Sequence, residues 1–214
     1  MKSFWIALTL FASAAGYGQD SYEFVNAMPP SEKPLKAIES DYYGLYTADS
    51  NSSFYEFNPD GIFINSVIYS SITKKEVRES SKYKVRNGHI FGVVKNDSVP
   101  CFLENEKYYF GIKQRKNLLD PSLGNVLKKQ TNSCYYLNYK EGNYFVPCML
   151  KFKGETVSIS FLDYDSNSYL FRNVIERKEV LQNNQKTVEL NLADYEWTNM
   201  DKEELYPKAL IFRK

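Results

Sequence analysis

Hydrophobic and polar residues alternate along several short stretches of this chain. The alternation is clearest in residues 82–86, 107–113, 156–162 and 187–192. A period of two places the apolar side chains of each stretch on one face of a β-sheet. Further apolar runs raise the expected number of strands to about a dozen, and no segment keeps helical spacing for three turns. We therefore predict an all-β protein, an antiparallel β-barrel or sandwich with one or two short helices, one of them beginning at Asp201.

The dipeptide Asn87-Gly88 lies between two strand patterns and is a strong signal for a β-hairpin. A two-residue turn at this position makes Arg86 face His89 and Val85 face Ile90. The apolar residues then share one face of the hairpin, so the hydrophobic pattern agrees with the register.

The segment EFNPDGIF, residues 56–63, resembles the start of a calcium-binding loop. Oxygen-bearing side chains occupy the first, third and fifth positions of that template, and glycine occupies the sixth, but the twelfth position is Val67 instead of a bidentate glutamate. The acidic loop at residues 163–168 departs from the template twice, with Ser168 at the sixth position and Val174 at the twelfth. Neither loop is therefore predicted to bind a metal.

The same residues fit a turn. Pro59 fixes φ, Asp60 favours the turn, and Gly61 accepts positive φ, as a type I turn closed by a glycine bulge requires. We predict a hairpin in which this three-residue loop brings Phe57 opposite Phe63.

The chain is divided into five segments by composition. Residues 1–18 read as a signal peptide, 19–40 as a proline-interrupted N-terminal arm, 41–115 as a first β-lobe, 116–132 as a connector, and 133–214 as a second β-lobe. Two similar pentapeptides, VPCFL and VPCML, lie on either side of the connector, so two tandem β-lobes are an alternative to one barrel.

The first residues carry the order of charges and apolar residues that is typical of export. Lys2 precedes an apolar run from Phe4 to Phe11 that is well short of the ~20 residues needed to span a bilayer, and small residues follow it. We predict a secreted or periplasmic protein with a cleaved signal peptide, no transmembrane segment after cleavage and, because the first cysteine is Cys101, no lipid anchor. The mature net charge is close to zero, which makes nucleic acid an improbable partner.

Few residues are available for catalysis or metal binding. His89 is the single histidine, and the chain has three cysteines, so a zinc site of four ligands would need all of them. The same shortage disfavours a Ser-His-Asp triad or a Cys-His pair. The sequence therefore selects no catalytic residue, no metal ligand and no cofactor.

A disulfide is expected from the register of a second hairpin. A three-residue turn at Lys140-Glu141-Gly142 would make Cys134 face Cys148, and a bond between them would stabilise an exported protein by ~3 kcal/mol. A bond from Cys101 to either partner and three reduced cysteines remain as alternatives.

The two ends of the chain resemble lipocalins. A short helical turn leads into Gly44-Leu45-Tyr46 on the first strand after the N-terminal arm, hairpins follow, and the last strand ends with Arg213. In lipocalins the first strand carries Gly-x-Trp and a late arginine packs over the tryptophan; Tyr46 stands at the place of that tryptophan. The resemblance implies a secreted β-barrel that encloses a small apolar ligand.

Three functional hypotheses follow. The first is a non-enzymatic β-protein that binds a small apolar or amphipathic ligand, or a partner at the cell surface. The second is a carboxylate-dependent hydrolase of an extracellular polymer, with two acidic side chains across an open cleft. The third is a carbohydrate-binding module, marked by a flat row of exposed tyrosines, of which the chain has 18.

Overall fold

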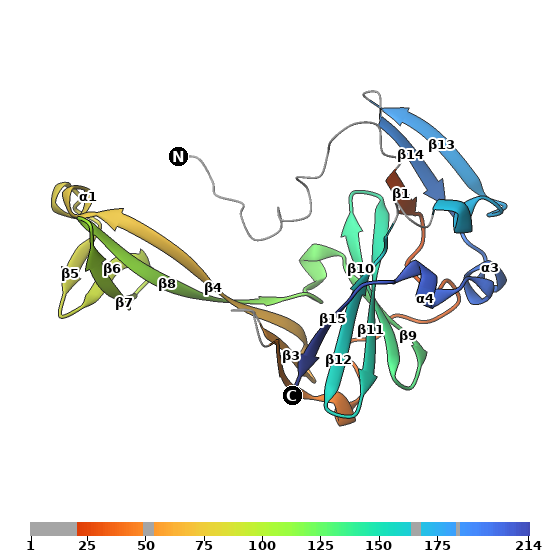
Figure 1. Ribbon diagram of the computed structural model, residues 1–214, viewed down its shortest axis with the longest axis horizontal. Coiled ribbons are helices and arrows are strands. Elements are labelled where there is room, and N and C mark those ends of the chain that lie inside the picture. The colour runs from red at the N-terminus through yellow and green to blue at the C-terminus, as the bar shows by residue number, and fades with distance from the viewer. Residues whose placement is uncertain (1–20, 49–53, 164–167, 183–184) are drawn as a thin grey trace.

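The computed structural model describes residues 21–48, 54–163, 168–182 and 185–214. These residues form a body, a long two-stranded stalk that leaves it, and a small distal lobe at the end of the stalk (Figure 1). The stalk consists of β4 (Gly61–Thr73) and β8 (Lys107–Asn117). The distal lobe consists of α1 (Lys74–Glu79), β5 (Lys84–Arg86), β6 (His89–Val94) and β7 (Asp97–Glu104). The prediction of an all-β fold is confirmed.

The body contains the other strands, together with short helical segments. The strands are β1 (Ser21–Phe24), β2 (Gly44–Thr47), β3 (Phe54–Asn58), β9 (Val126–Thr131), β10 (Cys134–Glu141), β11 (Tyr144–Lys153), β12 (Thr156–Phe161), β13 (Arg177–Gln182), β14 (Gln185–Leu190) and β15 (Ala209–Arg213). The helical segments are α3 (Asp194–Asn199), α4 (Lys202–Leu205) and three 3₁₀ turns, η1 (Ser40–Tyr42), η2 (Pro121–Leu123) and η3 (Ser168–Phe171).

The described strands belong to one hydrogen-bonded sheet that does not close into a barrel. Its main path runs β13-β14-β1-β11-β12-β15-β2-β3-β4-β8-β7-β6-β5, and β10 joins the other edge of β11, followed by β9. Because β4 and β8 leave the body together, the path ends in the distal lobe and does not return (Figure 1). Of the predicted barrel or sandwich, the barrel is therefore corrected to an open sheet. The sheet is also mixed, because β1 and β14 are parallel.

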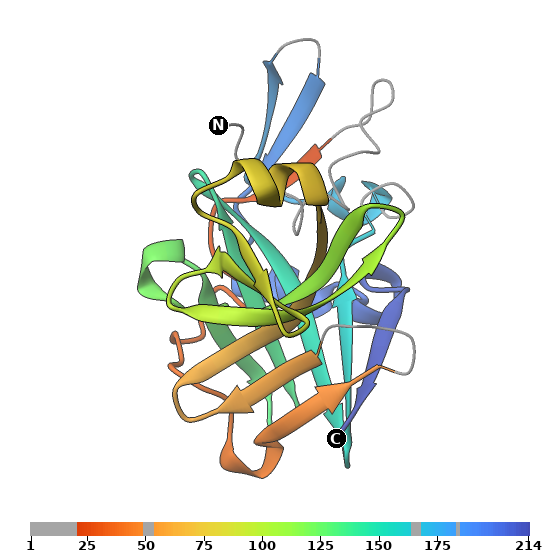
Figure 2. The same ribbon diagram turned by 90° about the vertical axis from the view of Figure 1, so that its left-hand side faces the viewer.

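The first core of the body lies between two groups of strands within this sheet. β15 and β2 are joined by a single residue pair, Arg213 with Thr47. Beyond this junction, β2, β3 and the start of β4 lie across β10, β11 and β12 (Figure 2). Aromatic side chains from both groups meet there. The Phe152 ring lies 4.4 Å from the ring of Tyr42 and 5.3 Å from that of Phe57, centroid to centroid. Strands from the predicted first and second lobes thus share one core.

The second core lies on the opposite face of β10 and β11. Tyr136 and Met149 point into it and meet β1, β14, α3 and α4. The Tyr136 ring packs edge-on against Trp197 of α3 at 5.1 Å. The central parts of β10 and β11 are therefore buried on both faces, which explains the apolar runs at residues 134–137 and 144–150.

Two local predictions are confirmed. Arg86 pairs with His89 and Val85 with Ile90, and the φ angles of 50° at Asn87 and 71° at Gly88 are those that an Asn-Gly turn supplies. At residue 201 the Asp201 carboxylate accepts hydrogen bonds from the backbone N–H groups of Glu203 and Glu204, so it caps α4 as expected.

The hairpin at residues 56–63 exists, but its predicted register is wrong by one residue. Asn58 pairs with Gly61, which leaves a two-residue turn, and Phe57 faces Ile62 while Phe63 faces Glu56. A shift of one residue moves every side chain of the second strand to the other face. Phe57 therefore lies in the first core, whereas Phe63 lies on the opposite face, under Arg115.

The predicted disulfide is also wrong. Glu141 pairs with Tyr144, so the turn between β10 and β11 consists of Gly142 and Asn143 and lies closer to β11 than predicted. The observed register therefore differs from the predicted one by three residues. Cys134 faces Lys151, and Cys148 faces Leu137. Cys148 lies in the first core and Cys134 packs against the second, on opposite faces of the hairpin. All three cysteines are free thiols, Cys101 lying in the distal lobe.

Candidate functional site

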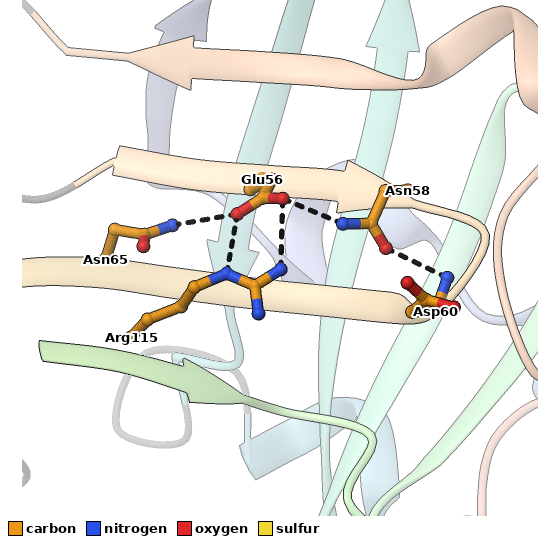
Figure 3. Close-up of polar contacts among 5 residues, drawn as sticks. All are labelled: Glu56, Asn58, Asp60, Asn65 and Arg115. Atoms are coloured by element: carbon orange, nitrogen blue, oxygen red, sulfur yellow. Dashed lines mark hydrogen bonds and ion pairs between the residues drawn. The ribbon is translucent and has the colours of Figure 1, made fainter.

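The carboxylate of the calcium-like segment is already held by an arginine. The Glu56 carboxylate accepts two hydrogen bonds from Arg115, at 2.9 Å from Nε and 3.0 Å from Nη2 (Figure 3). The side-chain amides of Asn58 and Asn65 donate to the same carboxylate. Asp60 does not join the group through its carboxylate; its backbone N–H donates to the Asn58 side chain at 2.9 Å. The segment is thus a hairpin end with an ion pair.

This ion pair has a consequence for stability. The hydrogen bonds and charge of Arg115 hold the pKa of Glu56 at about 2, below the ordinary 4.5. A carboxyl whose folded pKa is depressed stabilises the fold above its unfolded pKa, and that contribution is lost as the pH falls from about 4.5 to about 2. Because the Arg115 side chain is 48% exposed, solvent screening limits the contribution.

We predict that Arg115→Met lowers the free energy of unfolding at pH 7 and has little effect near pH 2, where Glu56 is largely protonated in the unfolded chain and gains little from the arginine. Methionine keeps the apolar cover of the Phe63 ring, which lies 3.4 Å from the guanidinium carbon. Urea denaturation across this pH range measures the difference. Lys116→Met, on the opposite face of β8, is the matched control. Parallel stability curves for wild type and Arg115→Met would contradict the prediction.

The other sequence candidates for metal binding are not brought together. His89 is exposed, with Nδ1 3.0 Å from the backbone oxygen of Asn87. Residues 164–167 of the second acidic loop lie outside the described residues, and Asp163, at its start, lies 3.5 Å from the Lys208 ammonium. Within the described parts of the chain, no three His, Cys, Asp or Glu side chains gather as a metal site.

Two carboxylates, Glu23 and Glu189, lie close to each other. Glu23 of β1 is the register partner of Glu189 of β14, and burial raises the pKa of Glu23, with a further rise from the charges of Glu141 and Glu189. The Tyr144 hydroxyl donates to Glu189 at 2.5 Å. The register places Glu23 and Glu189 side by side on neighbouring strands, whereas the predicted hydrolase requires carboxylates on opposite walls of a cleft.

Two hollows are open to solvent. A groove of about 500 Å³ runs beside α1, with Glu76, Glu79 and Phe110 among its lining residues. A groove of about 250 Å³ lies where the end of β1 meets β13 and β14. Both are surface features outside the first core, where a lipocalin-like ligand would be enclosed.

The most exposed aromatic side chains of the strands lie on one face of the sheet formed by the stalk strands and the adjoining β7. Tyr69 of β4 is 76% exposed and Phe102 of β7 is 62% exposed. Tyr69 pairs with Gly111, and Phe102 pairs with Tyr109, so all of these residues share one face of the sheet. We call this surface the stalk face and define it by Val67, Tyr69, Phe102, Tyr109 and Lys113.

The rings of the stalk face are held by their neighbours. Phe102 and Tyr109 stack at 5.4 Å with an angle of 20° between their planes. Tyr69 leans across Gly111, where an added Cβ would lie 3.4 Å from Cε1 of the Tyr69 ring and 2.7 Å from Cγ1 of Val67. Glycine at 111 therefore lets Val67 and Tyr69 lie close to the sheet. The result is a row of apolar surface on an open ribbon.

Sequence reasoning found only part of this surface. The alternation of residues 107–113 predicts the strand that carries Tyr109 and Lys113, and in the structure that strand continues to Asn117. Tyr69 was missed because the sequence of β4 has no regular alternation from which its exposed side could be read.

Comparisons with models of protein families, with curated proteins and with solved structures found no match for this chain. In the residues that the structure describes, no helix is long and apolar enough to cross a membrane.

Proposed function

We propose that this is a non-enzymatic extracellular binding protein that holds a surface polysaccharide against the stalk face. The observation that carries the proposal is the row of exposed rings from Tyr69 to Phe102, set on a ribbon that leaves the body. Aromatic rings present an apolar face with a polar or polarisable edge, which suits the apolar faces of sugar rings. The predicted signal peptide supports a location outside the cytoplasm.

The packing of the body favours a surface site over an enclosed ligand. Four aromatic rings surround Phe152 at centroid distances between 4.4 and 6.0 Å, and they occupy the space between β2–β4 and β10–β12. A lipocalin-like ligand would have to displace these side chains. Among the hypotheses that the sequence allows, a surface partner therefore fits the side-chain packing better than a small apolar ligand.

The arrangement of carboxylates is the reason for proposing a binding protein instead of a hydrolase. Glu23 and Glu189, the close-set pair, lie on adjacent parallel strands, and Glu104, the carboxylate beside the rings of the stalk face, is the register partner of Lys107. Neither arrangement supplies the two carboxylates on opposite walls of a cleft that the predicted hydrolase requires.

We predict that the double substitution Tyr69→Ala and Phe102→Ala weakens polysaccharide binding about 30-fold. Each ring is assigned about 1 kcal/mol of contact energy, and every 1.4 kcal/mol corresponds to a tenfold change in affinity. A panel of neutral and acidic polysaccharides screened by affinity electrophoresis, followed by calorimetry on the best ligand, measures the effect.

Tyr195→Ala is the matched control, because Tyr195 is 55% exposed on α3, away from the stalk. It is expected to bind as the wild type does. The proposal fails if no polysaccharide of the panel binds, or if the double variant binds as tightly as Tyr195→Ala.

A further inference from the structure

Charge is unevenly distributed between the stalk with its lobe and the rest of the chain. Residues 66–114 contain nine Lys and Arg against five Asp and Glu, a net charge of +4. The remaining residues contain 18 Lys and Arg against 21 Asp and Glu, a net charge of −3. The near-neutral total charge is therefore the sum of a basic stalk and distal lobe and an acidic remainder.

Three of the five acidic side chains of residues 66–114 already have hydrogen-bond or ion-pair partners within that segment. Glu76 accepts from the backbone N–H of Thr73 in the capping box of α1, and Asp97 accepts from the backbone N–H of Ser98. Glu106 forms an ion pair with Lys74. The other cations of residues 66–114 have no carboxylate within ion-pair distance in the described chain: Lys75, Arg78, Lys82, Lys84, Arg86, Lys95, Lys107 and Lys113. Their charge is available to a partner.

One of these cations lies on the stalk face itself. Lys113 is exposed, is the register partner of Val67, and lies one side-chain repeat along β8 from Gly111, over which Tyr69 leans. Lys107 lies on the same face beyond Tyr109, about 20 Å along the strand from Lys113. Arg115 is different, because Glu56 already neutralises it. The rings thus lie between Lys113 and Lys107 on one open ribbon, and Glu104 of β7 is the register partner of Lys107.

We propose that the ligand of the stalk face is an acidic polysaccharide. The rings of Tyr69, Tyr109 and Phe102 pack on sugar rings, while Lys113 binds a carboxylate or sulfate group beside them. This inference rests on the proposed function and adds the charge of the ligand. An extended polymer fits this surface because the rings and cations follow the strand direction. A lipid surface fits less well, because Tyr69 leans across Gly111, whereas insertion into a lipid layer requires a ring that stands out from the sheet.

The test compares dextran with dextran sulfate of matched length, using the full mature chain in 50 mM and in 500 mM NaCl. We expect dextran sulfate to bind at least about tenfold more tightly than dextran at low salt, and this preference to disappear at high salt, because free ions screen exposed charges. Lys113→Glu should remove about tenfold of the affinity for dextran sulfate and leave dextran binding unchanged. Lys153→Glu, an exposed cation of the body, is the matched control and should bind both as the wild type does.

The possible failures are distinguishable. If both polymers bind with equal affinity, independently of salt, and the Tyr69 and Phe102 substitutions abolish that binding, the charge inference is overturned while the proposed function holds. If neither polymer binds and vesicles of phosphatidylglycerol bind through Lys113, the occupant is a lipid surface and both proposals are overturned. Equal losses in Lys113→Glu and Lys153→Glu would mean that the preference reflects overall charge, which overturns the assignment to the stalk face.

Discussion

Replacement of Asn138 by leucine is expected to lower the free energy of unfolding by about 3 kcal/mol or more. Asn138 of β10 is fully buried. Its side-chain oxygen accepts from the backbone N–H of Met28 at 2.7 Å, and its amide donates to the backbone oxygens of Met28, Val126 and Tyr136. Leucine has a similar size but leaves these backbone groups without their partner, and each buried unsatisfied group costs about 1–3 kcal/mol.

Urea denaturation followed by circular dichroism measures the loss. Asn143→Leu, at an exposed position in the turn that ends the same strand, is the matched control and should change stability by no more than about 0.5 kcal/mol. If Asn138→Leu were as stable as this control, the network around Met28 would have no structural importance.

The same region explains why the N-terminal arm could not be read from the sequence. Its proline-interrupted sequence has no strand or helix periodicity, yet the Lys128 ammonium, buried in the body, donates to the backbone oxygens of Ala27, Pro29 and Pro30. These bonds join residues about a hundred positions apart in the chain. Local patterns contain no information on such partners, so the sequence placed Lys128 in the connector and gave no reason to single out Asn138.

The strands and the Asn-Gly hairpin were predictable because they depend on local chemistry. Val85 and Ile90 share a face as the alternation requires, and Asn87 and Gly88 supply the two positive φ angles of the turn. The glycines of the other two hairpins were less decisive. Gly61 and Gly142 are compatible with either a two-residue or a three-residue loop, and the sequence does not distinguish the two. The wrong choice produced the predicted disulfide and the wrong partner for Phe57.

The stalk face was beyond sequence reasoning for a different reason. Whether Tyr109 is a packed or an exposed residue depends on whether another layer covers its face of the sheet. β8 passes from the body to the distal lobe, and only the opposite face, with Phe110, meets a core in that lobe. The alternation of residues 107–113 identified a strand but not which of its faces would be covered.

Substitutions of Phe152 and Phe102 distinguish the structural role of the body from the binding role proposed for the stalk face. Phe152→Ala should lower the free energy of unfolding by about 3–5 kcal/mol, because it removes the central ring of the first core, where Phe152 is 3% exposed. Phe102→Ala should change stability by less than about 0.5 kcal/mol, because that ring is 62% exposed on the stalk face.

Binding should respond to these two substitutions in the opposite order. At a temperature where Phe152→Ala is still folded, its affinity for polysaccharide should equal that of the wild type, since the ligand does not enter the first core. Phe102→Ala, fully stable, should bind about fivefold more weakly. Thermal unfolding and calorimetry on the same two preparations decide the matter. A loss of binding in Phe152→Ala without loss of fold would place the ligand in the body, and would restore the enclosed apolar ligand as the better hypothesis.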